Sequence, residues 1–397
     1  MKTPQIKIQM RPEELFILSS IQVNPTQENL DRLNLLLTQI TDWDYLTQLA
    51  ISRQAAPFIY KKLPLLSNQN LVPETSKKQL QQAWFKTLSR SMVLIEHFSR
   101  LANTFNKAGL AFISMKGIYL SEWLYREVGL RQFSDIDLLV KEENGERALA
   151  LLESLGYKAQ ISNLPDFISK KLATIHYAPM VLNGVSVEIH TRLHNNLTPY
   201  QVNLDELWEN AEKINIHNAD TYVFNIESLL ITLSLHLDKH FKNKKFQFTG
   251  FYDIANLLNE YKSEINWTLF KTNCKNWNAD KHVYPYLLLT HKYLGAHLPE
   301  SVLNNAELDK QTENIFLNSM QGVIMREDNA QSNFNSIQHF QGNWAKLKFI
   351  LNMIFPPPAY LMQRYKLKNS LSLIIYYPIR FFSELKLGLK VFFGYNK

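Results

Sequence analysis

The chain has 397 residues, of which 46% are hydrophobic and 20% are charged, and it contains a single cysteine. This composition is typical of a folded protein of two or three domains and excludes an intrinsically disordered chain. One cysteine excludes an internal disulfide framework and a zinc site built from several cysteines, which favours a reducing compartment. The formal net charge of +7 favours polyanionic partners such as nucleotides or RNA.

Neither end of the chain has the pattern of a membrane-inserted or secreted segment. The first residues lack the apolar run of a secretory signal, and no window approaches the roughly 20 apolar residues that span a bilayer. We therefore expect a cytoplasmic protein without a transmembrane segment. The tail over 376–393 mixes basic and aromatic residues. Peripheral contact with a membrane surface is one interpretation of that tail, and packing on its own protein is the more common one.

The first 107 residues are expected to form an N-terminal helical domain. Apolar residues recur at helical spacing over 13–23 and 31–40, and Asp42 has the pattern of a capping residue before a further helix. A long amphipathic helix is predicted over 84–106.

Residues 108–198 have the pattern of a compact α+β unit with a mixed or antiparallel sheet. A helix after the first strand is expected to end at Gly129 as a C-cap, and Asn183-Gly184 is typical of a tight hairpin turn. The predicted elements are strands over 110–115 and 135–140, helices over 118–128 and 142–155, and a hairpin of 174–182 with 185–190.

The remainder of the chain is expected to be helical. Residues 199–300 would form a domain that closes a cleft over the central unit, and residues 301–397 would form a C-terminal helical extension. Helices are predicted over 229–240, 252–261 and 266–275.

Two carboxylates, Asp135 and Asp137, lie one residue apart in the second predicted strand. Successive side chains of a strand point to opposite faces, so both acids emerge on the same face. Adjacent anions raise each other's pKa, and a divalent cation such as Mg²⁺ would remove that conflict. As edge residues they should be replaceable without loss of the fold. A pair of solvated aspartates is the simpler alternative.

Glu188 lies on the hairpin and shares a face with His190. If the strand of Asp135 and Asp137 pairs beside the hairpin, three carboxylates converge, which suits a two-metal phosphoryl-transfer site. The two aspartates would contact both ions, whereas Glu188 would contact the ion near the acceptor and could help to remove its proton. His190 is either a further metal ligand or a structural neighbour of the site, and we favour the second interpretation.

The turn at Lys116 and Gly117 precedes a helix, where free backbone N–H groups and the positive end of the helix dipole meet. Gly117 would let the backbone approach phosphate oxygens, and Lys116 adds charge. Arg131 could reach the same phosphates with its fork of donors, or could instead pair with Glu122 or Glu127. A lysine and a glycine before a helix also occur as an ordinary turn.

A positive rim is expected where the helix over 229–240 ends, and it would face the cleft. It could hold NTP phosphates or an RNA acceptor, and a solvated charged face accounts for it equally well. Its members are Lys239, His240, Lys242, Lys244 and Lys245.

Together these motifs resemble the DNA polymerase β-type nucleotidyltransferase superfamily, and most closely its bacterial branch of stand-alone uncharacterised nucleotidyltransferases. The resemblance is specific over residues 110–192 and looser over most of the remaining chain up to about residue 300. The motifs that carry it are Met115-Lys116-Gly117, Gly129-Leu130-Arg131, Ser134-Asp135-Ile136-Asp137 and Val187-Glu188-Ile189-His190.

The resemblance implies an α+β fold in which a polymerase β-type domain is embedded between mostly helical segments. It implies transfer of a nucleoside monophosphate from an NTP to a hydroxyl-bearing acceptor, with release of pyrophosphate. Mg²⁺ or Mn²⁺ would be the cofactor. By position, the metal ligands and catalytic acids would be Asp135, Asp137 and Glu188, and the nucleotide-binding residues would be Lys116, Gly117, Arg131, Ser134, Lys239 and His240.

The acceptor is left open by these motifs and could be a small molecule, a peptide, a protein or tRNA. Gly117 is followed by Ile118, whereas the superfamily usually has a serine there and the toxin branch has Lys-Gly-Gly-Thr. The hydroxyl that would grip a phosphate is therefore missing. Two alternatives remain: a non-catalytic nucleotide- or RNA-binding module on the same fold, and a toxin-type nucleotidyltransferase that acts on tRNA or protein.

Overall fold

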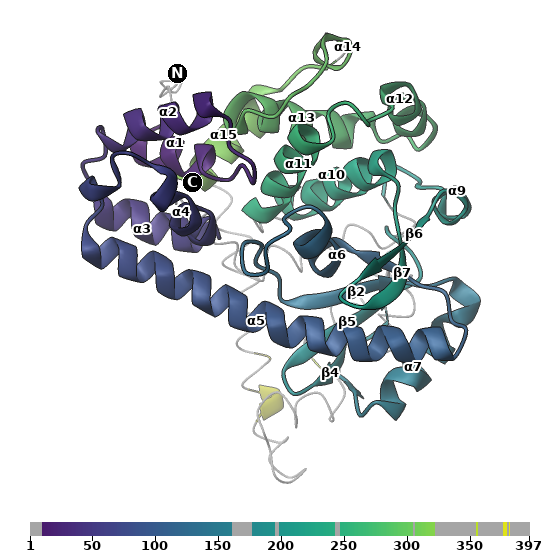
Figure 1. Cartoon of the computed structure of the whole chain (residues 1–397). Coiled ribbons are helices and arrows are strands. Elements are labelled where there is room, and N and C mark those ends of the chain that lie inside the picture. Colours follow the sequence, from purple (N-terminus) through teal and green to yellow (C-terminus); the bar gives the residue numbers. More distant parts are fainter. Residues whose placement is uncertain are drawn as a thin grey trace.

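The computed structural model describes residues 10–160, 177–194, 198–242, 247–304 and 306–321, together with residue 355, residues 376–378 and residue 381. A bundle of short helices is followed by one long helix, a mixed sheet and a second group of helices (Figure 1). The α+β class with a mixed sheet, predicted from the sequence, is confirmed.

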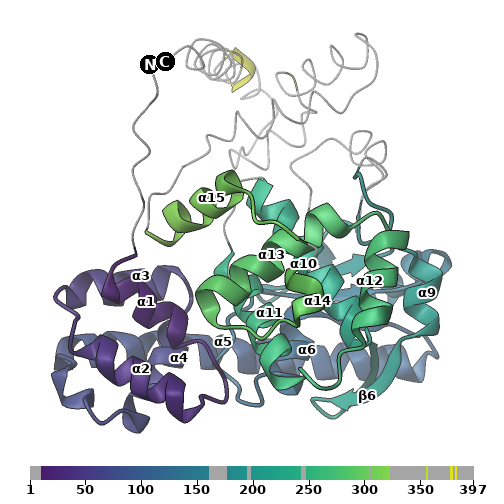
Figure 2. The ribbon, with the colours of Figure 1, turned by 90° about the horizontal axis from the view of Figure 1, so that it is seen from above.

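The N-terminal bundle consists of four short helices packed at one end of the long helix α5 (Figure 2). Asp42 caps α3 as predicted, since its side chain accepts a hydrogen bond from the Tyr45 N–H. The α5 helix begins ten residues earlier than the predicted start at 84. The bounds are α1 Pro12–Ser19, α2 Gln27–Leu37, α3 Trp43–Ser52, α4 Ala56–Lys62 and α5 Glu74–Lys107, with 3-10 turns at Leu63–Leu65 and Gln69–Leu71.

Seven strands form one mixed sheet in the order β3-β4-β5-β2-β1-β7-β6. The central strand β2 runs parallel to β5 and antiparallel to β1, and β1 runs parallel to β7. The strands are β1 Ile113–Met115, β2 Asp135–Leu139, β3 Lys158–Ala159, β4 Met180–Leu182, β5 Val185–His190, β6 Glu212–Ile216 and β7 Ala219–Val223.

Helices cover both faces of this sheet (Figure 1). The α5 helix and α7 (Gly145–Ser154, after a 3-10 turn at Glu142–Asn144) pack on one face, where Ile136 and Leu138 of β2 are fully buried. The α6 helix (Lys116–Trp123) and α10 lie on the other side. The remaining helices are α9 Leu204–Glu209, α10 Ile226–Lys242, α11 Phe248–Glu260, α12 Trp267–Asn276, α13 Asp280–Leu294, α14 Glu300–Leu303 and α15 Lys310–Met320.

The β4–β5 hairpin forms at the predicted turn. Asn183 and Gly184 both have positive φ, of 50° and 76°, as a two-residue turn that matches the strand twist requires. The part of the expected first strand that falls over 174–176 lies outside the described residues.

Two expectations for the backbone are wrong. The α6 helix ends at Trp123 rather than at residue 128, because Arg126 adopts a left-handed φ of 55° that an α-helix does not tolerate. The region after residue 199 is not purely helical, since β6 and β7 extend the sheet to Val223. The sheet therefore continues past the predicted boundary at residue 198, and the division into four domains stays a prediction.

Among the described residues, none of the helices is both long and apolar enough to cross a membrane. Most of the tail over 376–393, for which we considered contact with a membrane surface, lies outside the described residues.

Candidate active site

The parallel pairing of β2 with β5 sets the acidic side chains side by side. Asp137 lies opposite Glu188 in the register, and Asp135 lies one step earlier on the same face of β2. The predicted convergence of the three carboxylates is therefore present. The expectation that these acids are edge residues is wrong for Asp137, which is 6% exposed on the central strand.

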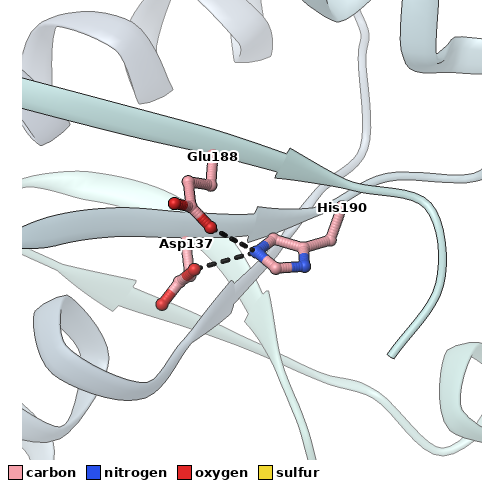
Figure 3. A group of neighbouring side chains, drawn as sticks. All are labelled: Asp137, Glu188 and His190. Atoms are coloured by element: carbon pink, nitrogen blue, oxygen red, sulfur yellow. Dashed lines mark hydrogen bonds and ion pairs between the residues drawn. The ribbon is translucent and has the colours of Figure 1, made fainter. Parts of the chain in front are cut away.

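His190 joins this cluster from β5, two residues beyond Glu188. Its Nε2 atom lies 2.8 Å from Oδ1 of Asp137 and 3.6 Å from Oε2 of Glu188 (Figure 3). One ligand atom from each of Asp137, Glu188 and His190 lies within 4.8 Å of the other two. Among the described residues this is the group whose ligand atoms are spaced closely enough to hold one metal ion.

Lys116 supplies a positive charge to the same cluster. Its Nζ atom lies 3.2 Å from Oδ2 of Asp137, and its side chain is 25% exposed. Its backbone is held at a φ of 51°, an uncommon conformation for a residue with a side chain. The side chain of the N-cap residue Met115 makes no capping hydrogen bond to α6, and the first N–H groups of a helix have no partner within the helix itself.

The pKa values of the two aspartates are shifted in opposite directions. Burial and the nearby Asp137 carboxylate raise the pKa of Asp135 to about 6. Burial would also raise the pKa of Asp137, but the Lys116 ammonium and the hydrogen bond from His190 hold it well below its usual range. Burial opposes the charged form of His190, yet its hydrogen bonds to Asp137 and Glu188 raise its pKa overall.

A cavity of about 350 Å³ opens over these residues, between the sheet, α6, α10 and the start of α11. All nine residues that the sequence marked as site residues line it. They are Lys116, Gly117, Arg131, Ser134, Asp135, Asp137, Glu188, Lys239 and His240. Apolar side chains, including Leu229, Leu233 and Phe224, also line the cavity.

Close packing against Phe133 requires a glycine at position 117, in addition to any role of Gly117 in letting the backbone approach a phosphate. A Cβ atom at this position would lie 2.6 Å from Cβ of Phe133, which is closer than two carbon atoms can approach. The glycine therefore lets the start of α6 lie directly against the loop before β2. Ser134, in the same loop, hydrogen-bonds through its side chain to Asp135 and lowers the pKa of that carboxyl.

Arg131 lines the cavity but is held by a partner that we did not predict. Its Nε and Nη2 atoms donate to the two carboxylate oxygens of Asp253 on α11, at 2.8 and 2.6 Å, and the Tyr125 hydroxyl donates to the same carboxylate at 2.7 Å. Both alternatives that we considered are wrong, because Glu122 pairs with His217 and Glu127 pairs with Lys61. The guanidinium fork therefore fixes α11 against the loop before β2 instead of pointing free toward a ligand.

The end of α10 brings Lys239 and His240 to the cavity wall. The side chains of Lys242, Lys244 and Lys245, which the sequence placed in the same rim, lie outside the described residues. His236, one turn before His240, also lines the cavity. Burial and the Lys116 charge lower its pKa well below the usual range.

The sequence showed His236 and His240 at the spacing of zinc-binding pairs, with Asp253 not far on, but it did not predict the places of His236 and Asp253 in the cavity wall, and it did not mark Gln54. Gln54 reaches the cavity from the N-terminal bundle, in a left-handed conformation with φ of 61°. The i, i+4 spacing of His236 and His240 was a usable signal, since it places both rings on one helical face. No local pattern could have paired Asp253 with Arg131, because the two residues lie 122 positions apart.

The residues at the centre of the cavity fit a divalent cation. Asp135, Asp137 and Glu188 offer carboxylate oxygens, which are preferred by hard cations. Burial and the Asp137 charge raise the pKa of Asp135, and a cation between the carboxylates would offset their repulsion.

The chain was compared with protein families, curated proteins and solved structures. A family model described as "Uncharacterised nucleotidyltransferase" matches residues 39–295, well over half of the chain. A comparison with curated proteins returns no match. The chain is also similar to an antigenic nucleotidyltransferase-like protein from Paracoccidioides brasiliensis, with 17% identity over 53% of this chain and 97% of that one. The TM-score of that pair is 0.30, so this similarity supports no conclusion about the fold or the function of the chain.

Proposed function

The chain belongs to the uncharacterised nucleotidyltransferase family, and we propose that it moves a nucleoside monophosphate from an NTP to a hydroxyl-bearing acceptor, with release of pyrophosphate. We also infer that its sheet is of the polymerase β type, as its motifs suggest; the bacterial branch within that superfamily stays a prediction. The observation that carries the proposal is the gathering of Asp135, Asp137 and Glu188 on one face of the sheet, inside a cavity large enough for a nucleotide.

Asp135, Asp137 and Glu188 would hold Mg²⁺ or Mn²⁺. When bound, such an ion supplies charge stabilisation for the triphosphate and its leaving group and makes an acceptor hydroxyl more acidic. Lys116 already neutralises Asp137 in this structure. Its ammonium is within reach of phosphate oxygens placed at the uncapped N-terminus of α6, where backbone N–H groups bind anions.

Each of the cavity residues has a distinct role in the proposed transfer. The bond between the acceptor oxygen and the α-phosphorus forms while the bond from that phosphorus to the bridging oxygen of pyrophosphate breaks. Glu188, which is less buried than Asp137, accepts the proton of the acceptor hydroxyl. Lys239 and His240 line the same cavity, where they would bind phosphates or the acceptor.

The proposal is tested with NTPs that carry a label on either the α- or the γ-phosphate. The purified chain, with Mg²⁺ or Mn²⁺, is incubated with a cell extract that supplies acceptors. We expect the α-label, and not the γ-label, to move to a new product, because a nucleotidyl group rather than a phosphoryl group is transferred. The size and nuclease or protease sensitivity of that product identify the acceptor class.

Two variants sharpen this test. Asp135→Asn should abolish transfer of the label, whereas Asp220→Asn should leave it unchanged, because Asp220 is a surface residue paired with Lys213 away from the cavity. Equal transfer by the wild type and Asp135→Asn, for all four NTPs, would contradict the proposed reaction.

A second candidate is a non-catalytic nucleotide- or RNA-binding module, and the residue after Gly117 favours it. Residue 118 is a fully buried isoleucine, which has no hydroxyl to offer a phosphate. Titration calorimetry separates the two functions. NTP binding that is unaffected by EDTA and is followed by no transfer supports the module, whereas metal-dependent binding followed by transfer supports the enzyme.

A further inference from the structure

The imidazole of His190 is aimed into the carboxylate cluster rather than packed behind it. Figure 3 shows its Nε2 atom between the carboxylates of Asp137 and Glu188. His190 is 6% exposed, and it stands on the same face of β5 as Glu188 because the two residues are two positions apart. The ring thus presents a nitrogen at the place where the acids would bind a cation.

The spacing of the three donor atoms matches one coordination sphere. Metal–ligand bonds to nitrogen and oxygen of roughly 2.0–2.2 Å place neighbouring ligand atoms about 3 Å apart and opposite ones about 4 Å apart. Here the nitrogen lies 2.8 Å from the Asp137 oxygen and 3.6 Å from the Glu188 oxygen, and all three atoms lie within 4.8 Å of one another. Small side-chain adjustments would bring all three onto a shared ion.

We propose that Nε2 of His190 is a direct ligand of one metal ion, together with Asp137 and Glu188, which makes this a mixed nitrogen and oxygen site. Imidazole is a good ligand for first-row transition metals and a poor one for Mg²⁺, which prefers oxygen. The site therefore binds a transition-metal ion such as Mn²⁺ more tightly than Mg²⁺. This inference reverses the role that the sequence favoured for His190, and it rests on the proposed function, since it concerns the metal of that site.

Asp135 is the acid left out of this group of three. It also lines the cavity and is less buried than Asp137. In the two-metal arrangement it would share the second ion with Asp137, on the side of Lys116 and the phosphates. The two ions would then differ in chemistry, with the nitrogen-containing sphere on the Glu188 side.

The test is pulsed electron paramagnetic resonance of Mn²⁺ bound to the full chain without nucleotide. We expect strong coupling of the Mn²⁺ spin to a directly bonded ¹⁴N nucleus in the wild type. In His190→Asn, which replaces the ring nitrogen by an amide oxygen, that coupling should be lost. His194→Gln is the matched control, because His194 lines the same cavity but contacts Thr198 and the Val202 N–H, and it should keep the coupling.

Affinity gives a second readout. Wild type should bind Mn²⁺ at least about tenfold more tightly than Mg²⁺, measured by the free Mn²⁺ signal and by competition, and His190→Asn should lose most of that preference. Because the wild-type spectrum alone tests for a bonded nitrogen, the inference stays falsifiable even if His190→Asn does not fold.

The outcomes separate this inference from the proposed function. Bound Mn²⁺ without a bonded nitrogen, or nitrogen coupling that survives in His190→Asn, overturns the His190 ligand even if label transfer from the NTP proceeds normally. A nitrogen coupling that disappears in His190→Asn supports His190 as a metal ligand. This holds even if the chain transfers no label from any NTP, because the lack of transfer would contradict only the proposed function.

Discussion

At the scale of single residues, Asp135 and Asp137 lie two positions apart but have opposite effects on the stability of the metal-free protein. The charge of Asp137 is stabilised by its partners, whereas the charge of Asp135 is destabilising. The charge of Asp137 is compensated by Lys116 at 3.2 Å and by His190 at 2.8 Å, whereas the pKa of Asp135 is raised to about 6 by burial and by the Asp137 charge. One carboxylate is therefore favourable in the metal-free protein and the other is not.

We expect the two amide variants to shift stability in opposite directions. In EDTA at pH 8, Asp137→Asn should lower the free energy of unfolding by about 2–3 kcal/mol, because it removes the buried charge that compensates Lys116 and accepts from His190. Asp135→Asn should raise it by about 1–3 kcal/mol, because it removes an unfavourable charge. Urea unfolding of the two variants beside wild type measures both. A loss of stability in both variants would contradict this assignment.

The gain in the free energy of unfolding that Asp135→Asn brings should depend on pH. The folded-state pKa of Asp135, about 6, lies above its ordinary value of 3.8, so the folded state binds the proton more tightly than the unfolded state does. As pH falls below about 6, Asp135 in the folded wild type takes up that proton. The difference in the free energy of unfolding between the wild type and Asp135→Asn then shrinks. The stability difference should be largest above pH 6 and close to zero near pH 4. A constant difference over this range would exclude a raised pKa for Asp135.

At the scale of elements, one buried ion pair joins α11 to the loop that leads into β2. Arg131 and Asp253 are 7% and 1% exposed, and each oxygen of Asp253 receives at least one hydrogen bond. The pair fixes a wall of the cavity without contacting the acids of the cluster.

Asp253→Asn should destabilise the chain by about 3–5 kcal/mol, because the guanidinium of Arg131 would stay buried without a counter-charge. Chemical denaturation measures the change. Glu260→Gln on the same helix is the control and should cost much less, since Glu260 accepts only an exposed hydrogen bond from Asn24. A cost for Asp253→Asn below about 1 kcal/mol would show that the pair does not hold α11 in place.

The elements that sequence reasoning predicted are those with strong local signals. The Asn183-Gly184 turn and the alternation of residues 185–190 predicted the β4–β5 hairpin and the shared face of Glu188 and His190. The β6–β7 hairpin was missed because its turn is His217-Asn218, an unusual pair for two positive φ angles, and because β6 is an edge strand with mostly exposed residues.

The candidate site was predictable where its residues are neighbours in sequence. Lys116 with Gly117, and Asp135 with Asp137, are short motifs, and all of them line the cavity. The partners of Arg131 and the contact of Gly117 with Phe133 depend on how distant segments pack, so no single motif reveals them.

At the scale of the whole molecule, the sheet and the cavity draw on distant parts of the chain. β1 pairs with β7, and the buried hydroxyls of Ser114 and Thr221 lie 2.8 Å apart across that pairing. The α5 helix covers the opposite face of the sheet, and Gln54 reaches the cavity from the N-terminal bundle. The predicted central domain is therefore incomplete by itself.

A fragment limited to residues 108–198 should fail to fold. It lacks α5 over one face and β7 beside β1, so buried apolar side chains and strand edges would meet water. Thermal unfolding followed by circular dichroism should show a cooperative transition for the full chain and none for the fragment. A cooperative transition in the fragment would instead support the boundaries at 108 and 198 that the sequence suggested.

The central claim is that nucleotide and metal meet at Asp135, Asp137 and Glu188 beside the N-terminus of α6. Crystals of the full chain with Mn²⁺ and an NTP whose α,β-bridge cannot be hydrolysed test it most directly, because manganese is located by anomalous diffraction. The account predicts manganese bonded to these three carboxylates and triphosphate oxygens beside Lys116. Manganese and nucleotide bound elsewhere, with Asp137 still paired to Lys116 and His190, would contradict it.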